Sequence, residues 1–168
     1  MFKAANIPPE DTDLPTVIGT LLKQKGLTMS AAESCTGGTI SQLITSVPGC
    51  SEYYLGSVTS YANSVKEKVL GVPASIIEQH GAVSSECVAK MAEGVRRLTG
   101  SDVSVATSGI AGPGGGTPDK PVGLVWIGVS TPLGTQTFRH LFTNDRARNI
   151  ERFAATALHH LHQEISAL

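Results

Sequence analysis

The stretch LTMSAAESCTGG, residues 27–38, decides the fold of this chain. Its first half, Leu27 to Ala32, is a short apolar run of strand length, and Ser34 to Gly38 form a turn of small and polar residues. A helical pattern of apolar side chains begins at Ile40. The stretch therefore predicts a buried strand, a tight loop and a helix, which is the opening unit of an α/β fold.

Predicted helices and strands alternate along the rest of the chain. Pro132-Leu133-Gly134 separates the last two strands, as is typical of a hairpin, so these strands are expected to run antiparallel. Strands separated by helices, with this one hairpin, predict an α/β fold whose sheet is mostly parallel, with helices on both faces. The expected helices are residues 14–25 (capped by Asp13), 63–70, 73–80, 84–98 and 145–165, and the further strands are residues 53–61, 103–107, 123–130 and 135–142.

Composition and charge narrow the classes of protein to which the chain can belong. Its 168 residues, 40% hydrophobic and 16% charged, describe one ordinary globular domain, residues 1–168, with 1–12 as a lead-in segment. Thirteen basic against fourteen acidic side chains provide no basic surface for nucleic acid or an anionic membrane. No apolar stretch is long enough to span a bilayer, and the N-terminus lacks the apolar core of a signal peptide.

The three cysteines, Cys35, Cys50 and Cys87, are an odd number and include no Cys-x-x-Cys pair. A disulfide framework is therefore not expected, and the simplest setting is the reducing cytoplasm. Cys35 adjoins Ser34 and could act as a thiolate. Since no histidine stands near Cys35 in the sequence, it is interpreted as a small buried residue.

Ser34 lies in the turn between the first predicted strand and the helix after it. Unpaired N–H groups at such a helix N-terminus can bind an oxyanion or a phosphate, and Gly37 and Gly38 leave the approach unobstructed. This position makes Ser34 a candidate nucleophile. An alternative stays open, because Ser34 or Thr36 can instead cap the helix.

A serine nucleophile needs a base, and histidine is hard to place in that role. Three of the five histidines, His159, His160 and His162, are predicted to face solvent on the last helix, without the carboxylates or thiols of a metal site. Lysine can serve when burial lowers its pKa. Tyr61 and Lys66 follow the second strand, at the predicted edge of the crevice, although Lys66 also fits a solvated position on a short helix.

A loop of high glycine content, Thr107–Thr117, follows another predicted buried strand. The most natural use of so much glycine is a main-chain cradle for a phosphate or another anion. The loop lacks the Lys-Ser or Lys-Thr of a Walker loop and the spacing of a dinucleotide-binding fingerprint. Arg146 and Arg152 on the last helix could reach a phosphate held there. A flexible surface loop and surface arginines are the alternatives.

Six motifs stand in order over nearly the whole chain beyond the first helix. They are AESCTGG (32–38), YANxxKxxVLGV (61–72), HGAVS (80–84), SGIAGPGGGT (108–117), KPVG (120–123) and DR (145–146). In this series the chain resembles the CinA C-terminal domain family. It departs from the expected Tyr-Ser-Asn at Tyr61-Ala62-Asn63, which removes one polar contact but leaves the proposed acid–base pair.

This resemblance implies a three-layer α/β/α sandwich with a mostly parallel mixed sheet, and a homo-oligomer such as a dimer. It also implies hydrolysis of nicotinamide mononucleotide to nicotinate mononucleotide and ammonia, in pyridine nucleotide recycling, with neither metal nor cofactor. The nucleophile would be Ser34, with Tyr61 and Lys66 as proton-transfer partners and the main-chain N–H groups around Ser34 to Gly37 stabilising the oxyanion. The expected substrate-binding residues are Cys35, Thr36, Gly37, Gly38, Asn63, Thr107, Ser108, Gly109, Gly112, Gly114, Gly115, Gly116, Thr117 and Arg146.

Two other functions remain open at this point. A nucleotide-binding module without catalysis, in keeping with the association of the family with competence and DNA damage, would need the glycine-rich loops but neither Tyr61 nor Lys66. An amidase acting on another small amide would keep the same residues, because the shape of the pocket sets the substrate. Larger family members carry a separate N-terminal domain resembling molybdopterin-binding proteins, for which this chain has no room, so a stand-alone amidase domain is expected.

Overall fold

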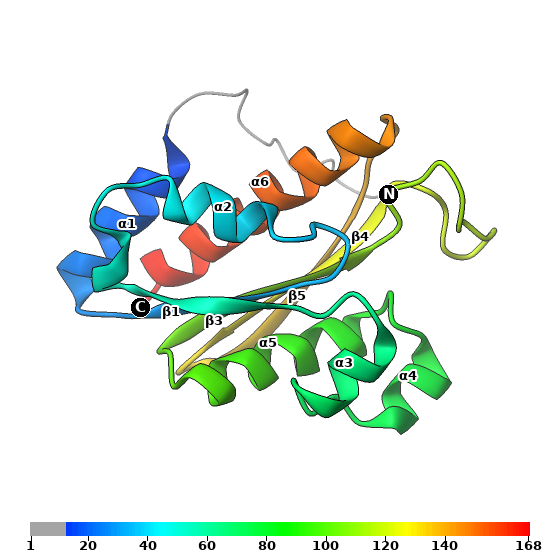
Figure 1. Cartoon of the computed structure of the whole chain (residues 1–168), viewed down its shortest axis with the longest axis horizontal. Coiled ribbons are helices and arrows are strands. Elements are labelled where there is room, and N and C mark those ends of the chain that lie inside the picture. The colour runs from blue at the N-terminus through cyan, green and yellow to red at the C-terminus, as the bar shows by residue number, and fades with distance from the viewer. Residues whose placement is uncertain (1–12) are drawn as a thin grey trace.

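In residues 13–168, which a computed structural model describes, five strands form one sheet in the order β2-β1-β3-β4-β5 (Figure 1). The first three strands are parallel, and β4 is antiparallel to both of its neighbours. The predicted α/β fold with a mostly parallel mixed sheet is confirmed, while the lead-in segment 1–12 lies outside the described residues. The strands are β1 (Met29–Glu33), β2 (Tyr54–Thr59), β3 (Val103–Gly109), β4 (Leu124–Thr131) and β5 (Gly134–Leu141).

Helices cover both faces of the sheet, so the chain forms three layers (Figure 1). Successive residues of β1 explain this arrangement, because Ala31 packs in one apolar cluster and Ala32 in the other. On one face lie α1 (Leu14–Lys25), α2 (Thr39–Thr45) and α6 (Arg146–Ser166), and on the other lie α3 (Asn63–Lys68), α4 (Ala74–His80) and α5 (Ser85–Thr99), with a short 3-10 helix η1 (Cys50–Glu52) before β2.

Local capping fixes where the longer helices begin and end. The Ser84 hydroxyl accepts a hydrogen bond from the N–H of Cys87 at the start of α5, and Asp145 accepts one from the N–H of Arg148 at the start of α6. Gly26 ends α1 in the left-handed conformation, with φ of 65°. Asp13 stands at the N-cap of α1 as predicted, and its carbonyl accepts the N–H of Val17, but its side chain forms no capping hydrogen bond.

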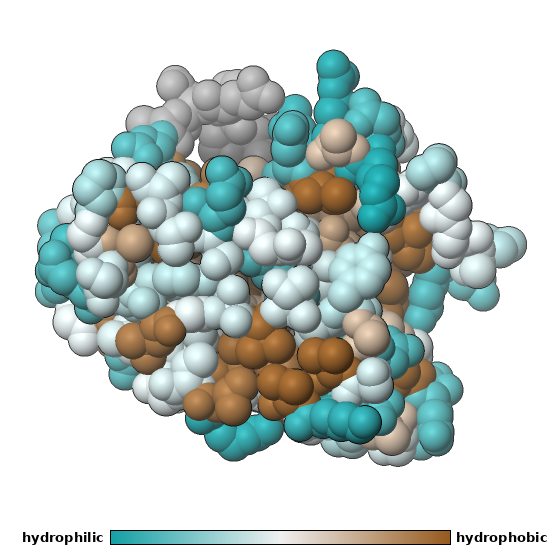
Figure 2. Space-filling model, in the orientation of Figure 1, coloured by the Kyte–Doolittle hydropathy of each residue, from teal (hydrophilic) through white to brown (hydrophobic). Residues whose placement is uncertain are grey.

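Strand β2 forms one open edge of the sheet. Its pairing with β1 is irregular at Leu55, because Met29 pairs with Tyr54 and the next residue of β1 pairs with Gly56. Leu55 and Val69 are both exposed, and apolar surface gathers beneath β2 and beside α3 on the face shown in Figure 2. An irregular edge of this kind discourages pairing with a further strand.

No helix in the described part of the chain is both long and apolar enough to cross a membrane.

His160 contradicts the prediction that the histidines of the last helix face solvent. Its side chain is buried, its ring stacks on Phe138 with 3.8 Å between ring centroids, and its Nε2 lies 2.8 Å from Nε2 of His140 on β5. The reason is helical periodicity, because α6 lies against the sheet and His160 shares its inner face with Ala157 and Leu161. Burial lowers the pKa of His160 to about 4, and repulsion from His140 adds to the effect.

We expect the buried His160 to make the fold sensitive to acid. An unfolded histidine binds its proton near pH 6.5 and the folded one only near pH 4, so stability falls as the pH drops through this window. The loss amounts to about 3 kcal/mol in the free energy of unfolding. Urea denaturation at pH 7 and pH 4 should show a smaller difference for His160→Gln than for the unmodified chain, whereas His162→Gln should leave it unchanged. Equal losses in both variants would contradict the assignment.

Candidate active site

The turns that follow the three parallel strands meet at one edge of the sheet. Because β1, β2 and β3 run in the same direction, their carboxyl ends lie side by side, as in other open α/β folds that bind ligands there. Ser34 directly follows β1, Ser60 and Tyr61 follow β2, and the glycine-rich loop follows β3. The residues predicted to act together thus come from three neighbouring turns.

Ser34 and Lys66 form the centre of the site. The Nζ atom of Lys66 lies 3.0 Å from Oγ of Ser34, although 32 residues separate the two positions. Lys66 is only 1% exposed, and its Nζ donates hydrogen bonds to the main-chain carbonyls of Ser60 at 2.7 Å and Tyr61 at 3.2 Å. The alternative that Lys66 is a solvated helix residue was therefore wrong, because the first turn of α3 points this side chain into the sheet edge.

The surroundings of Lys66 suit it to act as a base. Burial lowers the pKa of its amine, and no carboxylate within residues 13–168 forms an ion pair with it. A neutral amine has two N–H groups and one lone pair. The carbonyls of Ser60 and Tyr61 take the two N–H groups, which leaves the lone pair to accept the hydroxyl hydrogen of Ser34. The geometry is that of a nucleophile held against its general base.

The turn after Ser34 offers two free main-chain donors. The N–H of Ser34 donates to the carbonyl of Thr107 at 3.0 Å, and that of Gly37 donates to the carbonyl of Ser34 at 3.1 Å. Within the described residues, the N–H groups of Cys35 and Thr36 have no acceptor. Of the N–H groups from Ser34 to Gly37 that were predicted to bind an oxyanion, only those of Cys35 and Thr36 remain available within the described residues. Those of Ser34 and Gly37 already donate to main-chain carbonyls.

Glu33 occupies the start of α2. Its buried carboxylate accepts a hydrogen bond from the Thr36 hydroxyl at 2.6 Å and bonds from the N–H groups of Gly38 at 3.1 Å, Ile40 at 3.0 Å and Ser41 at 2.8 Å. The alternative that Ser34 or Thr36 caps this helix was therefore wrong. Sequence reasoning missed the role of Glu33, and the available signal was an acidic residue at the end of an apolar strand.

Thr107 and Ser108 support the site but do not line it. Both are buried, the Thr107 hydroxyl lies 2.8 Å from the Thr36 hydroxyl, and the Ser108 hydroxyl donates to the carbonyl of Ala82 at 2.8 Å. Thr36 is buried as well, so only its N–H is free for a ligand. The sheet and the β1–α2 turn bury all three side chains, which leaves main-chain atoms for a ligand, and substrate binding by these three residues stays a prediction.

Tyr61 approaches Lys66 through its main chain and not through its hydroxyl. Tyr61 is 61% exposed as a residue, and its phenol oxygen accepts a hydrogen bond from Nη2 of Arg146 at 3.2 Å. Nη1 of the same arginine donates to the carbonyl of Gly112 at 2.8 Å. Arg146 therefore joins Tyr61 to the glycine-rich loop, which brings together residues from three distant parts of the sequence.

A cavity of about 230 Å³ lies beside this cluster. Cys35 contributes to its wall, but burial raises the pKa of the thiol to about 12, so Cys35 is not a thiolate nucleophile. Ile110 and Ala111 also contribute to the wall and were not among the predicted residues. The lining residues are Cys35, Tyr61, Gly109, Ile110, Ala111, Gly114, Gly115 and Arg146.

The remaining predicted positions have different surroundings. Gly38, with φ of 108°, leads into α2, and Gly37, with φ of 59°, precedes it in the left-handed region. A Cβ at Gly116 would lie 2.8 Å from the N–H nitrogen of Val122, so this glycine serves packing within the loop. Asn63 is the exposed first residue of α3, and Thr117 forms a turn with Lys120.

A profile of the CinA C-terminal domain matches residues 11–165. The chain belongs to the CinA C-terminal domain family. A CinA-like protein of Salinibacter ruber is 49% identical to it over 156 residues, which are 93% of this chain and 38% of that protein. A CinA-like protein of Thermotoga maritima is 47% identical over 151 residues, which are 90% of this chain and 37% of that protein. The chain thus spans less than two fifths of the length of these relatives.

Solved CinA structures share the same fold. A CinA superfamily protein of Klebsiella pneumoniae superposes with a TM-score of 0.89 at 31% identity, covering 92% of this chain and 97% of that one. A competence/damage-inducible protein of Agrobacterium tumefaciens superposes with a TM-score of 0.85 at 34% identity, covering 91% and 93% of the two chains. These similarities each extend over more than nine tenths of this chain.

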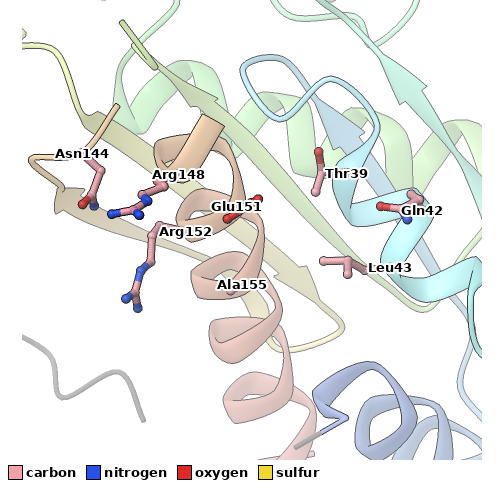
Figure 3. Close-up of a pocket in the computed structure, with 8 residues that line it drawn as sticks. All are labelled: Thr39, Gln42, Leu43, Asn144, Arg148, Glu151, Arg152 and Ala155. Carbon is pink, nitrogen blue, oxygen red and sulfur yellow. The ribbon is translucent and has the colours of Figure 1, made fainter. Parts of the chain in front are cut away.

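This CinA domain has a second cavity, of about 680 Å³, between α2 and α6. Figure 3 shows Thr39, Gln42 and Leu43 on α2, across from Glu151 on α6. Arg152, predicted to reach a phosphate, lies here together with Arg148. Neither Ser34 nor Lys66 is among the residues that line either cavity. The smaller cavity is the one next to them, because its wall includes Cys35, which follows Ser34 in the chain, and Tyr61, whose carbonyl binds Lys66.

Proposed function

We propose that this CinA domain is an amidohydrolase that converts nicotinamide mononucleotide to nicotinate mononucleotide and ammonia. The supporting observation is the 3.0 Å separation between Ser34 and a buried Lys66 that has no carboxylate partner in the described part of the chain. A serine next to a neutral lysine is suited to acyl transfer. The CinA family includes nicotinamide mononucleotide deamidases, which supports this substrate.

In the first half of the reaction, Ser34 attacks the carboxamide carbon while its hydroxyl proton passes to Nζ of Lys66. The carbonyl oxygen becomes an oxyanion that accepts hydrogen bonds from the free N–H groups of Cys35 and Thr36. The Lys66 ammonium then gives its proton to the amide nitrogen. The carbon–nitrogen bond breaks, ammonia leaves, and an ester remains on Ser34.

In the second half, water replaces ammonia beside Lys66. The neutral amine takes a proton from the water as its oxygen attacks the ester carbon, and the same N–H groups hold the second oxyanion. Collapse of this intermediate returns the proton to Oγ of Ser34 and releases the carboxylic acid, which loses its proton to solvent. The two carbonyls bound to Nζ keep Lys66 in place through both steps.

Arg146 suits an anionic substrate. Its guanidinium lines the smaller cavity, and no carboxylate in residues 13–168 pairs with it. The loop residues Gly114 and Gly115 beside it carry no side chain that would obstruct a phosphate. We propose that Arg146 and this loop hold the ribose phosphate while the carboxamide lies at Ser34. The homo-oligomer expected from the family resemblance stays a prediction.

The test is ammonia release from nicotinamide mononucleotide by the purified chain and by Ser34→Ala. Removal of the nucleophile should lower kcat at least about a thousandfold without changing the melting temperature by more than a few degrees. Nicotinamide riboside, which lacks the phosphate, should be hydrolysed with a higher KM.

Three other outcomes would each change the proposal. If the riboside and the mononucleotide are turned over with the same KM, Arg146 and the glycine-rich loop do not bind the phosphate. Release of ammonia only from other small amides would keep the chemistry and change the substrate. Binding of the mononucleotide without turnover by a folded chain would favour a nucleotide-binding module instead.

A further inference from the structure

We propose that Glu33 is a positioning and specificity-determining residue. Its buried carboxylate holds the turn that carries Ser34 and disfavours the binding of an anionic product at that turn. This inference rests on the proposed amidase function. It concerns a residue that does not touch the substrate and that acts through the groups bonded to it.

The hydrogen bonds to Glu33 have a defined direction. The Thr36 hydroxyl gives its only hydrogen to Oε2 of Glu33, so in its 2.8 Å contact with the Thr107 hydroxyl it must accept. Oε2 also accepts from the N–H groups of Gly38 and Ile40, and Oε1 accepts from Ser41. One carboxylate therefore fixes the start of α2 and sets the orientation of the Thr36 and Thr107 hydroxyls.

This network reaches the nucleophile from both sides. Glu33 is the residue before Ser34 in the chain, and its own carbonyl accepts the N–H of Ser60, whose carbonyl in turn binds Lys66. On the other side, the Thr107 carbonyl accepts the N–H of Ser34. Since Gly38, Ile40 and Ser41 give their N–H groups to Glu33, the free donors left in the turn are those of Cys35 and Thr36.

The charge of Glu33 distinguishes substrate from product. No lysine, arginine or histidine in the described residues pairs with this carboxylate, which is compensated only by N–H and hydroxyl dipoles. Its charge lies close to the turn, because Oε2 of Glu33 is 2.6 Å from the hydroxyl of Thr36, whose N–H is one of the two free donors. A neutral carboxamide at the Cys35 and Thr36 donors meets no repulsion, whereas a product carboxylate there does.

The oxyanion of the reaction is not penalised in the same way. When the oxyanion forms, Lys66 carries the proton taken from Ser34, so the reacting group and Lys66 together stay neutral. After the product has lost its proton to solvent, Lys66 is neutral again and the carboxylate faces Glu33 without a compensating cation. Glu33 thus acts on the product state and favours its release.

The experiment compares Glu33→Gln with the unmodified chain, measuring kcat and KM for nicotinamide mononucleotide and the inhibition constant of nicotinate mononucleotide. A glutamine oxygen in the place of Oε2 keeps three of the four hydrogen bonds, so the variant is expected to fold. We expect kcat to fall about tenfold and the ratio of the product inhibition constant to KM to fall about three- to tenfold. Glu52→Gln, with an exposed carboxylate, should change neither quantity.

Thr36→Val separates positioning from charge. It removes the hydroxyl link but keeps the Glu33 carboxylate, so kcat should fall while the ratio of product inhibition constant to KM stays at the value of the unmodified chain. If circular dichroism shows Glu33→Gln to be unfolded, Glu33→Asp takes its place, and it should lose kcat and keep the ratio. Three results would overturn the inference. The first is a ratio of product inhibition constant to KM that does not change in Glu33→Gln. The others are a fall of this ratio in Thr36→Val or in Glu33→Asp, and full kcat in Thr36→Val. Absence of turnover by the unmodified chain would instead refute the proposed function.

Discussion

Replacing Lys66 with methionine is expected to lower kcat for nicotinamide mononucleotide at least about a thousandfold. Methionine is similar to lysine in length and volume but has no amine to accept a proton. Ser34 should therefore keep its position and lose its base. Ammonia release under saturating substrate measures the effect. Lys68→Met alters an exposed lysine on the same helix and should keep kcat within about twofold.

The pH dependence of the proposed reaction in the unmodified chain adds a second readout to this prediction. Lys66 acts as a base only when it is neutral, so kcat should rise with pH and level off once the amine has lost its proton. Because burial lowers the pKa of Lys66, this rise should end below the ordinary pKa of a lysine. A rate that is independent of pH across that range, or Lys66→Met with substantial activity, would assign the base to another group.

Replacing Gly94 with alanine is expected to destabilise the fold by about 3 kcal/mol and to lower activity as well. A Cβ at Gly94, on α5, would overlap with the main-chain carbonyl oxygen of Leu70 and lie 2.9 Å from its carbonyl carbon. Leu70 lies just beyond α3, where the N–H of Val72 bonds to the carbonyl of Lys66. Relief of the overlap must therefore move the segment that places the base.

Thermal unfolding and ammonia release on the same preparation test this coupling. For a chain of this size, 3 kcal/mol corresponds to a fall in Tm of about 10 °C. Lys90→Ala, on the exposed side of α5, should leave both quantities nearly unchanged, since within residues 13–168 its side chain pairs only with Glu93, at the surface. An alanine at position 94 that leaves Tm and kcat as they were would show that α5 and the Leu70 segment can separate freely.

Much of the site could be predicted from sequence because its main parts are local. The Ser34 turn directly follows an apolar strand, Gly37 and Gly38 mark the turn, and parallel strands bring their carboxyl ends to one edge. The pairing of Ser34 with Lys66 then required only that the second strand lie beside the first, as it does.

The parts that could not be predicted depend on which way side chains point in the folded chain. Thr107 turned inward because β3 is buried on both faces, which no property of the loop after it reveals. The hydroxyl of Tyr61 meets Arg146 across 85 residues of sequence, a contact set by where α6 begins. The role of Glu33 was overlooked because the function of a carboxylate in a buried strand depends on which groups donate hydrogen bonds to it, and the sequence does not show these groups.

The smaller cavity also has consequences for how such a domain can evolve. Ser34 comes from the turn after β1 and Lys66 from α3, whereas much of the cavity wall comes from the loop after β3 and from the start of α6. Gly114 has open space around it, so a mutation there can add a side chain to the wall without touching the reactive pair. Under the proposed function, substitutions in this loop can therefore change which amide is accepted while Ser34 and Lys66 stay unchanged.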